Sequence, residues 1–510
     1  MDHQKISKKS HKIFSNTSVL LVFIAIGALV IRLYYLPYNI PISLDGLLYF
    51  WYATDTSSLG HLPQGYTFPN NLWPLFLSPF FYAIKSDFLN LMFLQRLLSV
   101  LISIATIIPL YFFCKRFFDR NYALIGVILF IFEPRIVQNS TLGLTEPLFI
   151  LLGITTLVLF FSSKTSYQCF SFATLALFSL TRYEGLLLLV PITVIYFIRF
   201  GKKRDSIFRY LLMLTIFILV ITPIAYLRIE TTGKDGLTSH VLSGAEVASD
   251  NIIKTDETVK KFSVFNGIII FGKMIGWSTI PIFLLFIPFG LYKVFTYRNV
   301  MNYSIIFIGL VFLVPAAYAY SRNIEEVKYL FIIFPFFSLI SLFTIRALIE
   351  KTKQRNYIVF ILICGIIFSS VLFLNWKTDY EHEIEAVKIA EEVAKRTSVI
   401  NDYHPESVYL RTVGFSDHQD FAGKREIIHN KIKILFAERF DSLKSFLDYA
   451  KQEKLGFLLV DEQKSRPEFL RDIFENENRY PFLIKEYDSK EHEFKYHVKI
   501  FRINYESLNE

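Results

Sequence analysis

Long apolar runs separated by short polar connections constrain this chain more than any other feature of its sequence. Hydrophobic residues make up 53% of the chain and aromatic residues 17%, which exceeds what a soluble globular domain of this length usually shows. Runs of this kind cross a bilayer as helices of about 20 residues. The sequence therefore predicts a polytopic α-helical membrane protein with about eleven transmembrane helices. The predicted spans lie within residues 18–36, 89–113, 122–132, 148–161, 167–180, 185–200, 210–227, 280–295, 303–319, 329–349 and 357–373.

Lysine and arginine residues occupy every second connection between these runs, on the same side as the basic N-terminus. The positive-inside rule makes that side cytoplasmic. We therefore expect a multi-pass protein of the cell membrane whose N-terminus is cytoplasmic and whose loops 37–87 and 228–273 lie outside, together with everything after residue 376. Because the basic residues sit in these connections, the net charge of +9 does not indicate a nucleic-acid partner.

The chain changes character near residue 377, where charged residues become frequent and the apolar runs become short. We predict a transmembrane domain over residues 1–376 and an extracytoplasmic α/β domain over residues 377–510. The alternating pattern favours a partly parallel sheet covered by helices. The expected strands are 408–413, 456–460 and 496–503, and the expected helices are 381–395 and 440–451. This segment has no phosphate-binding glycine loop and no catalytic triad pattern, which favours an acceptor-binding or purely structural role over a catalytic one.

Charged residues of both signs fall at the predicted outer ends of the apolar runs. Charge near hydrocarbon is costly, so such residues usually face a wet cavity and mark a functional site. Carboxylates at such a site can activate a nucleophile, while arginines can neutralise an anionic group such as a phosphate. The pattern favours an enzyme. The residues that form it are Asp45, Glu133, Arg135, Glu146, Arg182 and Glu184.

Five local motifs resemble those of a known family. An acidic residue and an aromatic run follow the first span at 44–53, and a Tyr/Pro-rich segment follows at 66–75. Further motifs lie at 140–148, 179–186 and 327–335. In their order and spacing they resemble the C-type membrane glycosyltransferases, and within them the branch of protein O-mannosyltransferases and aminoarabinose transferases. Two departures are notable: Gly46 follows Asp45 where many members carry a second acid, and the Trp-Trp-Asp motif of oligosaccharyltransferase catalytic subunits is absent.

The resemblance implies that one sugar moves from a polyprenyl- or dolichyl-phosphate donor to a protein, glycan or lipid acceptor. Such a donor already carries a good leaving group, so the reaction needs an acceptor base and neutralisation of the phosphate. We expect no cofactor. Outer carboxylates could bind Mg²⁺ or Mn²⁺, but no dense acidic motif requires a metal ion, so we name no metal ligands. Asp45 is the candidate base, because a carboxylate beside an apolar aromatic segment is partly desolvated; its alternative role is to cap the next helix.

Arg182 is the candidate phosphate ligand, because a guanidinium stays charged and can bind two phosphate oxygens. Lys328 and Arg322 are expected to add positive charge from another helix. Arg182 can instead form an ion pair with Glu184 or Glu146, or extend to the membrane interface. The remaining candidates are expected to line the pocket or to hold one another in place, and they are Glu146, Glu184, Glu133, Arg135 and Tyr66.

Two other classes of protein share the polytopic pattern. A transporter or lipid flippase typically places ionisable residues near the middle of the bilayer and often shows inverted repeats, and we see neither in the sequence. A non-catalytic scaffold that presents the outer domain would not need acids and arginines at the ends of many spans. Transfer of label from a lipid-linked sugar distinguishes the three classes.

Overall fold

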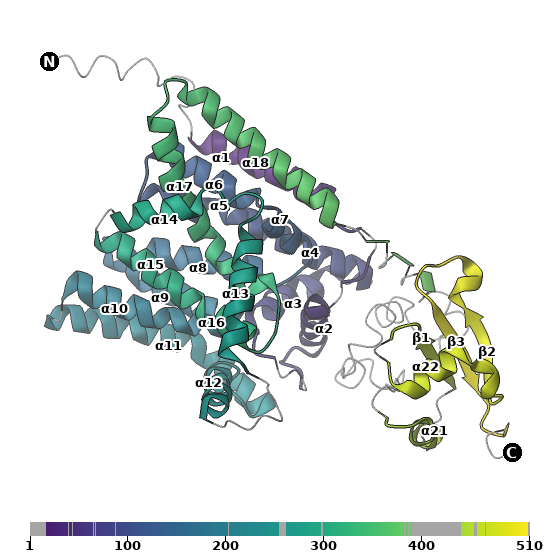
Figure 1. The fold of residues 1–510 in the computed structure, drawn as a ribbon. Coiled ribbons are helices and arrows are strands. Elements are labelled where there is room, and N and C mark those ends of the chain that lie inside the picture. The colour runs from purple at the N-terminus through teal and green to yellow at the C-terminus, as the bar shows by residue number, and fades with distance from the viewer. Residues whose placement is uncertain are drawn as a thin grey trace, which may run out of the picture. The chain divides into compact units, whose positions relative to one another are not determined.

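The computed structural model describes a mainly helical protein (Figure 1). It divides into two compact units, which are described separately: the first comprises Met1–Leu36, Thr67–Phe76 and Arg96–Thr378, and the second comprises Pro37–Tyr66, Leu77–Gln95 and Asp379–Glu510. The residues described are 17–38, 40–42, 44–64, 66, 68–86, 88–201, 203–253, 262–296, 299–378, 380–381, 384–385, 388–389, 440–452, 456–464 and 466–507.

The helices follow one another closely along the chain. Up to residue 377 they are α1 (Thr17–Tyr34), α2 (Leu44–Leu59), α3 (Leu72–Ile84), α4 (Phe88–Ala105), α5 (Ile107–Lys115), α6 (Arg120–Ile131), α7 (Pro134–Thr141), α8 (Glu146–Phe160), α9 (Thr165–Thr181), η1 (Tyr183–Leu188), α10 (Leu189–Phe200), α11 (Arg204–Thr232), α12 (Thr238–Ile253), α13 (Val264–Thr279), α14 (Ile287–Thr296), α15 (Val300–Phe312), α16 (Val314–Ser321), η2 (Val327–Ile333), α17 (Phe334–Glu350) and α18 (Arg355–Lys377). The two elements labelled η are 3-10 helices.

Seven helices in the described part of the chain are long and apolar enough to cross a membrane. They are Thr17–Tyr34, Leu89–Lys115, Tyr183–Phe200, Arg204–Thr232, Val300–Ser321, Val327–Glu350 and Arg355–Lys377. The count becomes eight if α6 and α7, which are bent by 55° at a short break, form one span. A polytopic helical fold is therefore observed, but the predicted number of eleven spans is not confirmed.

The difference from the predicted spans is clearest between residues 228 and 296. The predicted outer loop 228–273 contains the end of α11, all of α12 and the start of α13. The predicted span 280–295 instead begins with a turn and ends with the ten-residue helix α14. Hydropathy alone located the apolar residues but not the breaks between them, because a short turn can be as apolar as the helices that it joins.

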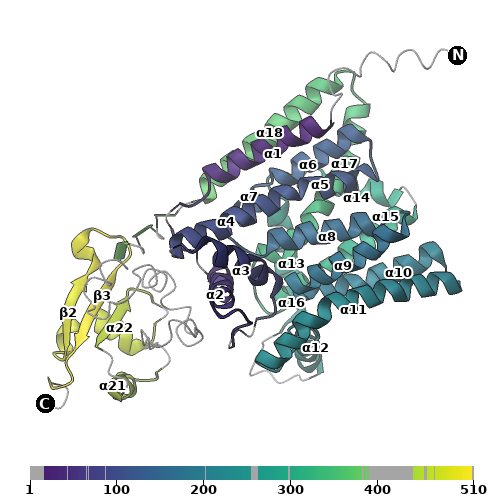
Figure 2. The same cartoon turned by 180° about the vertical axis from the view of Figure 1, so that it is seen from behind.

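Helices α1 and α18 run side by side along one edge of the first unit (Figures 1 and 2). The hydroxyl of Tyr35, directly after α1, donates a hydrogen bond to Asn375 Oδ1 near the end of α18 at 2.5 Å. The two helices therefore run in the same direction, and the chain leaves the first unit after Leu36 and after Thr378 at the same end of this helix pair.

Basic residues of two connections lie at the end of the helical bundle opposite to Glu146, the acid that begins α8. Arg116, after α5, donates hydrogen bonds to the carbonyls of Phe161 at 2.9 Å and Val158 at 2.6 Å. Arg199, near the end of α10, donates to the carbonyl of Phe160 at 3.4 Å. The three accepting carbonyls lie at the C-terminal end of α8, whereas Glu146 begins that helix. Helix α9 packs against both α8 and α11, and these helices connect the two ends.

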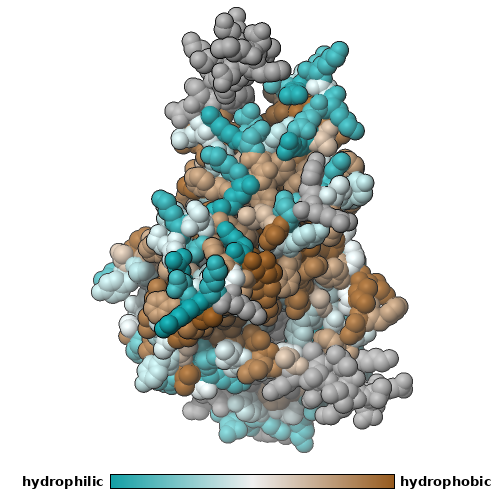
Figure 3. Space-filling view, turned by 90° about the vertical axis from the view of Figure 1, so that its left-hand side faces the viewer, coloured by the Kyte–Doolittle hydropathy of each residue, from teal (hydrophilic) through white to brown (hydrophobic). Residues whose placement is uncertain are grey.

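The surface of the first unit carries many exposed apolar side chains. Figure 3 shows large hydrophobic areas, in brown, on one face of the molecule, with hydrophilic groups beside them. A soluble monomer rarely exposes apolar area of this extent, so the surface fits contact with lipid. Among the largely exposed apolar residues are Phe208, Phe265, Leu285, Phe360 and Phe368.

The described part of the tail contains both helices and strands. The helices are α21 (Leu443–Gln452) and α22 (Glu468–Glu475), with the short 3-10 turns η6 (Glu477–Arg479) and η7 (Ser489–His492). The strands are β1 (Phe457–Asp461), β2 (Leu483–Asp488) and β3 (Val498–Ile503), in the order β1-β3-β2. Strands β1 and β3 and helix α21 agree with the expected elements, whereas β2 was not predicted.

The expected partly parallel sheet is wrong for the described strands, because β3 pairs antiparallel with both of its neighbours. For β2 and β3 the reason is the connection between them, which is too short for a crossover and therefore returns the chain antiparallel. The expected strand 408–413 and most of the expected helix 381–395 lie outside the described residues.

Candidate functional site

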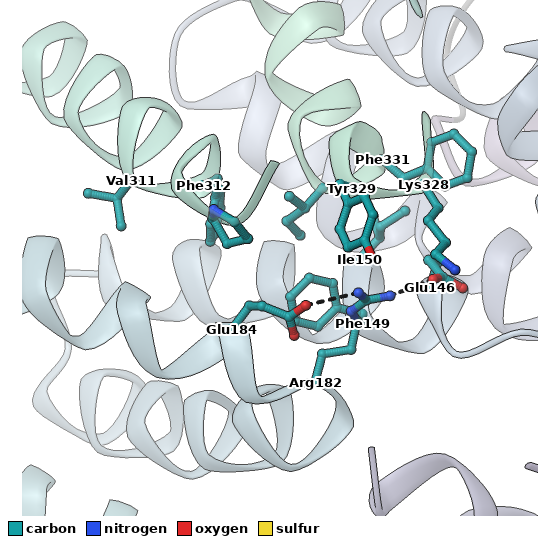
Figure 4. Close-up of a pocket in the computed structure, with 12 residues that line it drawn as sticks. Glu146, Phe149, Ile150, Arg182, Glu184, Val311, Phe312, Lys328, Tyr329 and Phe331 are labelled. Carbon is teal, nitrogen blue, oxygen red and sulfur yellow. Dashed lines mark hydrogen bonds and ion pairs between the residues drawn. The ribbon is translucent and has the colours of Figure 1, made fainter. Parts of the chain in front are cut away.

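A pocket lies where the starts of α8, η1 and η2 meet in the first unit (Figure 4). Four charged side chains line it, and all four were singled out in the sequence: Glu146, Arg182, Glu184 and Lys328. The rest of the lining is apolar or aromatic and consists of Phe149, Ile150, Val311, Phe312, Pro315, Tyr329, Phe331 and Ile332. A few polar groups in an apolar wall are typical of a pocket that binds a small molecule.

Arg182 lies between the two glutamates. Its Nη1 donates to Glu146 Oε1 at 2.5 Å and its Nη2 donates to Glu184 Oε1 at 2.9 Å. The guanidinium also lies near the rings of Phe149 and Tyr329, at 5.8 and 5.9 Å from their centroids. Figure 4 shows the guanidinium between the two carboxylates. The structure therefore contains both ion pairs that the sequence offered as alternatives to phosphate binding.

The local backbone explains why Arg182 and Glu184 point to the same place. Arg182 has an extended conformation, with φ −147° and ψ 130°, and it separates α9 from η1. The amide of Gly185 then donates to the Arg182 carbonyl at 2.9 Å and closes a tight turn. A Cβ atom on Gly185 would lie 2.9 Å from the Cα of Ser179 and from Phe178 Cδ1, so this close return of the chain requires glycine.

Each glutamate of the pocket uses one carboxylate oxygen for Arg182. Within the described residues, the second oxygen, Oε2, of both Glu146 and Glu184 is buried and has no hydrogen-bond partner. Only 4% of the Glu146 side chain and 10% of the Glu184 side chain is exposed. A buried acceptor without a partner costs about 1–3 kcal/mol, and more when it is charged, so these two atoms mark where the pocket can accept a hydrogen-bond donor.

The other two predicted cations differ in position. Lys328 lines the pocket, where its Nζ pairs with Glu326 Oε2 at 2.6 Å and lies 5.8 Å from the Tyr329 ring centroid. Arg322, after α16, is exposed, packs over the ring of Tyr318 and is not among the residues that line the pocket. Positive charge in this part of the pocket therefore comes from Arg182 and Lys328.

Glu133 and Arg135 form a separate cluster at the break between α6 and α7. Glu133 caps α7 by accepting a hydrogen bond from the Ile136 amide at 2.9 Å, and it pairs with Arg135 at 3.2 Å. Arg135 also donates to the carbonyl of Trp277 at 2.7 Å and to that of Ile280. Its guanidinium lies 4.6 Å from the Phe373 ring centroid. Neither residue lines the pocket, and their contacts join α7 to α13 and α18.

The predicted aromatic segment after the first span forms helix α2 in the second unit. Asp45 lies in the first turn of α2 and is half-buried. Tyr66, which was expected in the pocket, donates its hydroxyl to Asp55 Oδ2 at 2.5 Å, and its ring stacks on Tyr52 at 4.9 Å. Asp55 is 1% exposed and was not singled out in the sequence. An acid ten residues after Asp45, within an apolar aromatic stretch, was the available signal.

Arg32 is a second buried charge that sequence reasoning missed. It is 0% exposed in α1 and donates hydrogen bonds to Ser140 Oγ and Ser103 Oγ, both at 3.1 Å, and to the Ala28 carbonyl at 3.2 Å. These contacts join α1 to α4 and α7. The arginine within the first apolar run was its signal, since charge inside a span usually has a partner on another helix.

The described tail has its own buried ion pair. Arg466 donates to both carboxylate oxygens of Asp461, at 2.9 and 2.6 Å, and the Tyr496 hydroxyl donates to Asp461 at 2.9 Å. Burial alone would raise the pKa of Asp461, but Arg466 and Tyr496 outweigh it and hold the pKa below its usual range. Because the folded-state pKa is lowered, this pair stabilises the fold above the usual carboxyl pKa and loses that effect as the pH falls.

Across the described chain, no group of three or more His, Cys, Asp or Glu residues is arranged to hold a metal ion.

Comparison with known proteins gives a consistent result for the membrane region. Residues 75–226 match the family model described as dolichyl-phosphate-mannose-protein mannosyltransferase. The predicted resemblance is confirmed. The matched segment contains Glu146, Arg182 and Glu184, but it does not reach Asp45, Lys328 or Arg322. No curated protein sequence gives a significant match.

Solved structures share the fold at low sequence identity. The apo structure of ArnT from Cupriavidus metallidurans aligns with a TM-score of 0.58 and 11% identity, over 96% of this chain and 98% of that one. The apo oligosaccharyltransferase of Archaeoglobus fulgidus aligns with a TM-score of 0.58 and 10% identity, over 87% of this chain and 69% of that one. The same archaeal enzyme, AglB, in complex with an inhibitory peptide and a dolichol-phosphate, aligns with a TM-score of 0.55 and 9% identity over the same shares. This chain therefore shares its fold with ArnT and with the archaeal oligosaccharyltransferase.

Proposed function

We propose that this protein transfers one sugar from a polyprenyl- or dolichyl-phosphate donor to a protein, glycan or lipid acceptor. The observation that carries the proposal is the pocket of Glu146, Arg182, Glu184 and Lys328, which combines both signs of charge with an apolar wall at one end of the helical bundle. The family match includes three of these four residues. The complex of the archaeal neighbour with dolichol-phosphate supports a lipid-phosphate donor.

In the proposed reaction, the acceptor hydroxyl or amine attacks the anomeric carbon of the donor sugar. The bond between that carbon and the phosphate oxygen breaks, and the polyprenyl phosphate leaves with the bonding electron pair. Asp45 takes the acceptor's proton as general base. Arg182 and Lys328 stabilise the negative charge on the leaving phosphate, and Arg322 adds positive charge closer to solvent. No step requires a metal ion or an organic cofactor.

The proposed location is the extracytoplasmic face of the cell membrane. The grouping of basic residues at the C-terminal end of α8, opposite to Glu146, supports it, because basic connections favour the cytoplasmic side. The parallel arrangement of α1 and α18 also supports it, since both helices begin beside basic connections. On this topology the donor is used outside the cell, where nucleotide sugars are absent.

The experiment is transfer of labelled sugar by the full-length protein in sealed, right-side-out membranes. A panel of undecaprenyl phosphates carrying mannose, glucose, N-acetylglucosamine or aminoarabinose serves as the donors. We expect one donor to lose its label to an acceptor that external glycosidase or protease can reach. Failure of every donor in the panel, with folded and inserted protein, would contradict the proposed function.

A further inference from the structure

The two glutamates of the pocket cannot bind the donor phosphate through hydrogen bonds. A phosphate group presents negatively charged hydrogen-bond acceptors, and so does a carboxylate. Glu146 Oε2 and Glu184 Oε2 are buried acceptors without a partner among the described residues, and both side chains line the pocket. A ligand that forms hydrogen bonds with them must therefore supply O–H or N–H donors.

We infer that Glu146 and Glu184 bind hydroxyl groups of the donor sugar, and so contribute to the choice of sugar. The inference rests on the proposed function. The sugar is bonded directly to the phosphate, and Lys328, a proposed phosphate ligand, lines the same pocket as the two acids. A hydroxyl-rich ring next to a phosphate would thus place its donors toward the carboxylates and its anionic end toward Lys328.

Arg182 fixes the two acids at separate points. Because its Nη1 binds one carboxylate and its Nη2 binds the other, the guanidinium holds Glu146 and Glu184 on its two sides (Figure 4). A single acceptor selects for one hydroxyl position, whereas two separated acceptors select for two hydroxyl positions at once. In this arrangement Arg182 has two functions, as the positioning residue for the acids and as a neighbour of the phosphate.

The apolar wall strengthens these hydrogen bonds. Phe149, Ile150 and Phe331 line the pocket beside the charged residues. Little water reaches the carboxylates, so a hydrogen bond from a sugar hydroxyl replaces no strong bond to solvent. A buried polar site of this kind rejects a ligand that lacks the matching hydroxyl much more strongly than an apolar pocket rejects a change in size.

The test is a pair of affinities measured on the purified full-length protein in lipid nanodiscs. One ligand is undecaprenyl phosphate, and the other is the glycosylated undecaprenyl phosphate that the wild type binds most tightly in the panel above. Glu146→Gln and Glu184→Gln keep the side-chain shape but remove the charge. Glu133→Gln, a buried glutamate outside the pocket, is the matched control.

We expect each pocket variant to bind the glycosylated lipid on the order of 10- to 100-fold more weakly, since a hydrogen bond to a buried charge is among the strong ones. Binding of undecaprenyl phosphate should change less than about twofold, which also shows that the variants are folded. Glu133→Gln should leave both affinities unchanged. Equal weakening for both lipids, or tighter binding of undecaprenyl phosphate alone, would overturn the inference.

Donors that lack one hydroxyl at a time test the same inference without relying on the protein variants alone. On the wild type, removal of the hydroxyl that Glu146 or Glu184 binds should cost the same factor as the corresponding Gln variant. On that variant the same removal should cost little more. A wild type that transfers sugar but binds every deoxy donor as well as the parent donor would contradict the role of the two acids, and it would leave the proposed transfer reaction standing.

Discussion

Two buried clusters in the helical bundle use the same residue types in different ways. In one, Arg182 holds Glu146 and Glu184; in the other, Arg135 holds Glu133. Arg135 also donates hydrogen bonds to the carbonyls of Trp277 and Ile280, and both carboxylate oxygens of Glu133 accept hydrogen bonds.

The pocket glutamates differ from Glu133 in one respect. Each keeps one buried carboxylate oxygen for which the described structure provides no partner, and each lines a pocket. A buried ion pair whose hydrogen-bonding atoms all have partners can hold two helices together. A buried ion pair with an unpartnered acceptor lowers the stability of the fold by the desolvation cost of that acceptor. Whether all the carboxylate oxygens have hydrogen-bond partners, more than charge or burial, therefore separates the structural cluster from the candidate binding site.

The largest effect is expected for Asp45, an acid that belongs to neither cluster. Asp45→Asn removes the proposed general base and should lower the rate of sugar transfer by about 10²- to 10⁴-fold. Donor affinity and protein folding should stay near wild-type values, since the amide keeps the side-chain shape. The rate is measured with the labelled donor in purified membranes. Turnover near the wild-type rate would remove Asp45 from the mechanism.

The cluster of Glu133 and Arg135 is tested by its effect on the free energy of unfolding. Arg135→Ala leaves Glu133 buried without its ion pair and removes two bonds to backbone carbonyls, so it should cost about 3–5 kcal/mol of the free energy of unfolding. The loss is measured by thermal denaturation in detergent. Whatever protein remains folded should show a donor KM close to that of the wild type. A large rise in KM at unchanged stability would instead place Arg135 in the binding site.

The role of Arg182 is tested by a set of three variants. Arg182→Ala should weaken binding of undecaprenyl phosphate and slow transfer, on the order of 10- to 100-fold, because it removes charge-assisted hydrogen bonds. Arg182→Lys keeps the charge but loses the two-armed geometry, so its effect should be smaller. The double variant Arg182→Ala/Glu184→Ala should not restore transfer. Full rescue in the double variant would show that the arginine only pairs with Glu184, and the phosphate assignment would fail.

The sequence allowed the membrane class and the charged candidates to be predicted, because both depend on local composition. Glu146, Arg182, Glu184 and Lys328 were named from their places at the ends of apolar runs, and the structure brings these four together. The separation of Glu133 and Arg135 from the pocket was not predictable, since it depends on the break between α6 and α7 and on contacts with residues about 140 positions away.

The described fold also shows where hydropathy loses information. It cannot distinguish one long span from two short helices with an apolar turn, which is why the predicted span 280–295 became a turn and α14. The sheet direction was wrong because a short β2–β3 connection was overlooked when β2 itself was missed. Asp55 was missed because its partner, Tyr66, lies in a different segment, so the pair exists only after folding.

The most direct test compares the two clusters in a single measurement. The rate of sugar transfer per folded, inserted molecule is measured for Glu146→Gln and for Glu133→Gln at a donor concentration well below KM. We expect a loss on the order of 10- to 100-fold for Glu146→Gln, since the hydrogen bond to the sugar loses its charge, and a change of less than about twofold for Glu133→Gln. Equal losses in the two variants, or a larger loss in Glu133→Gln, would contradict this expectation.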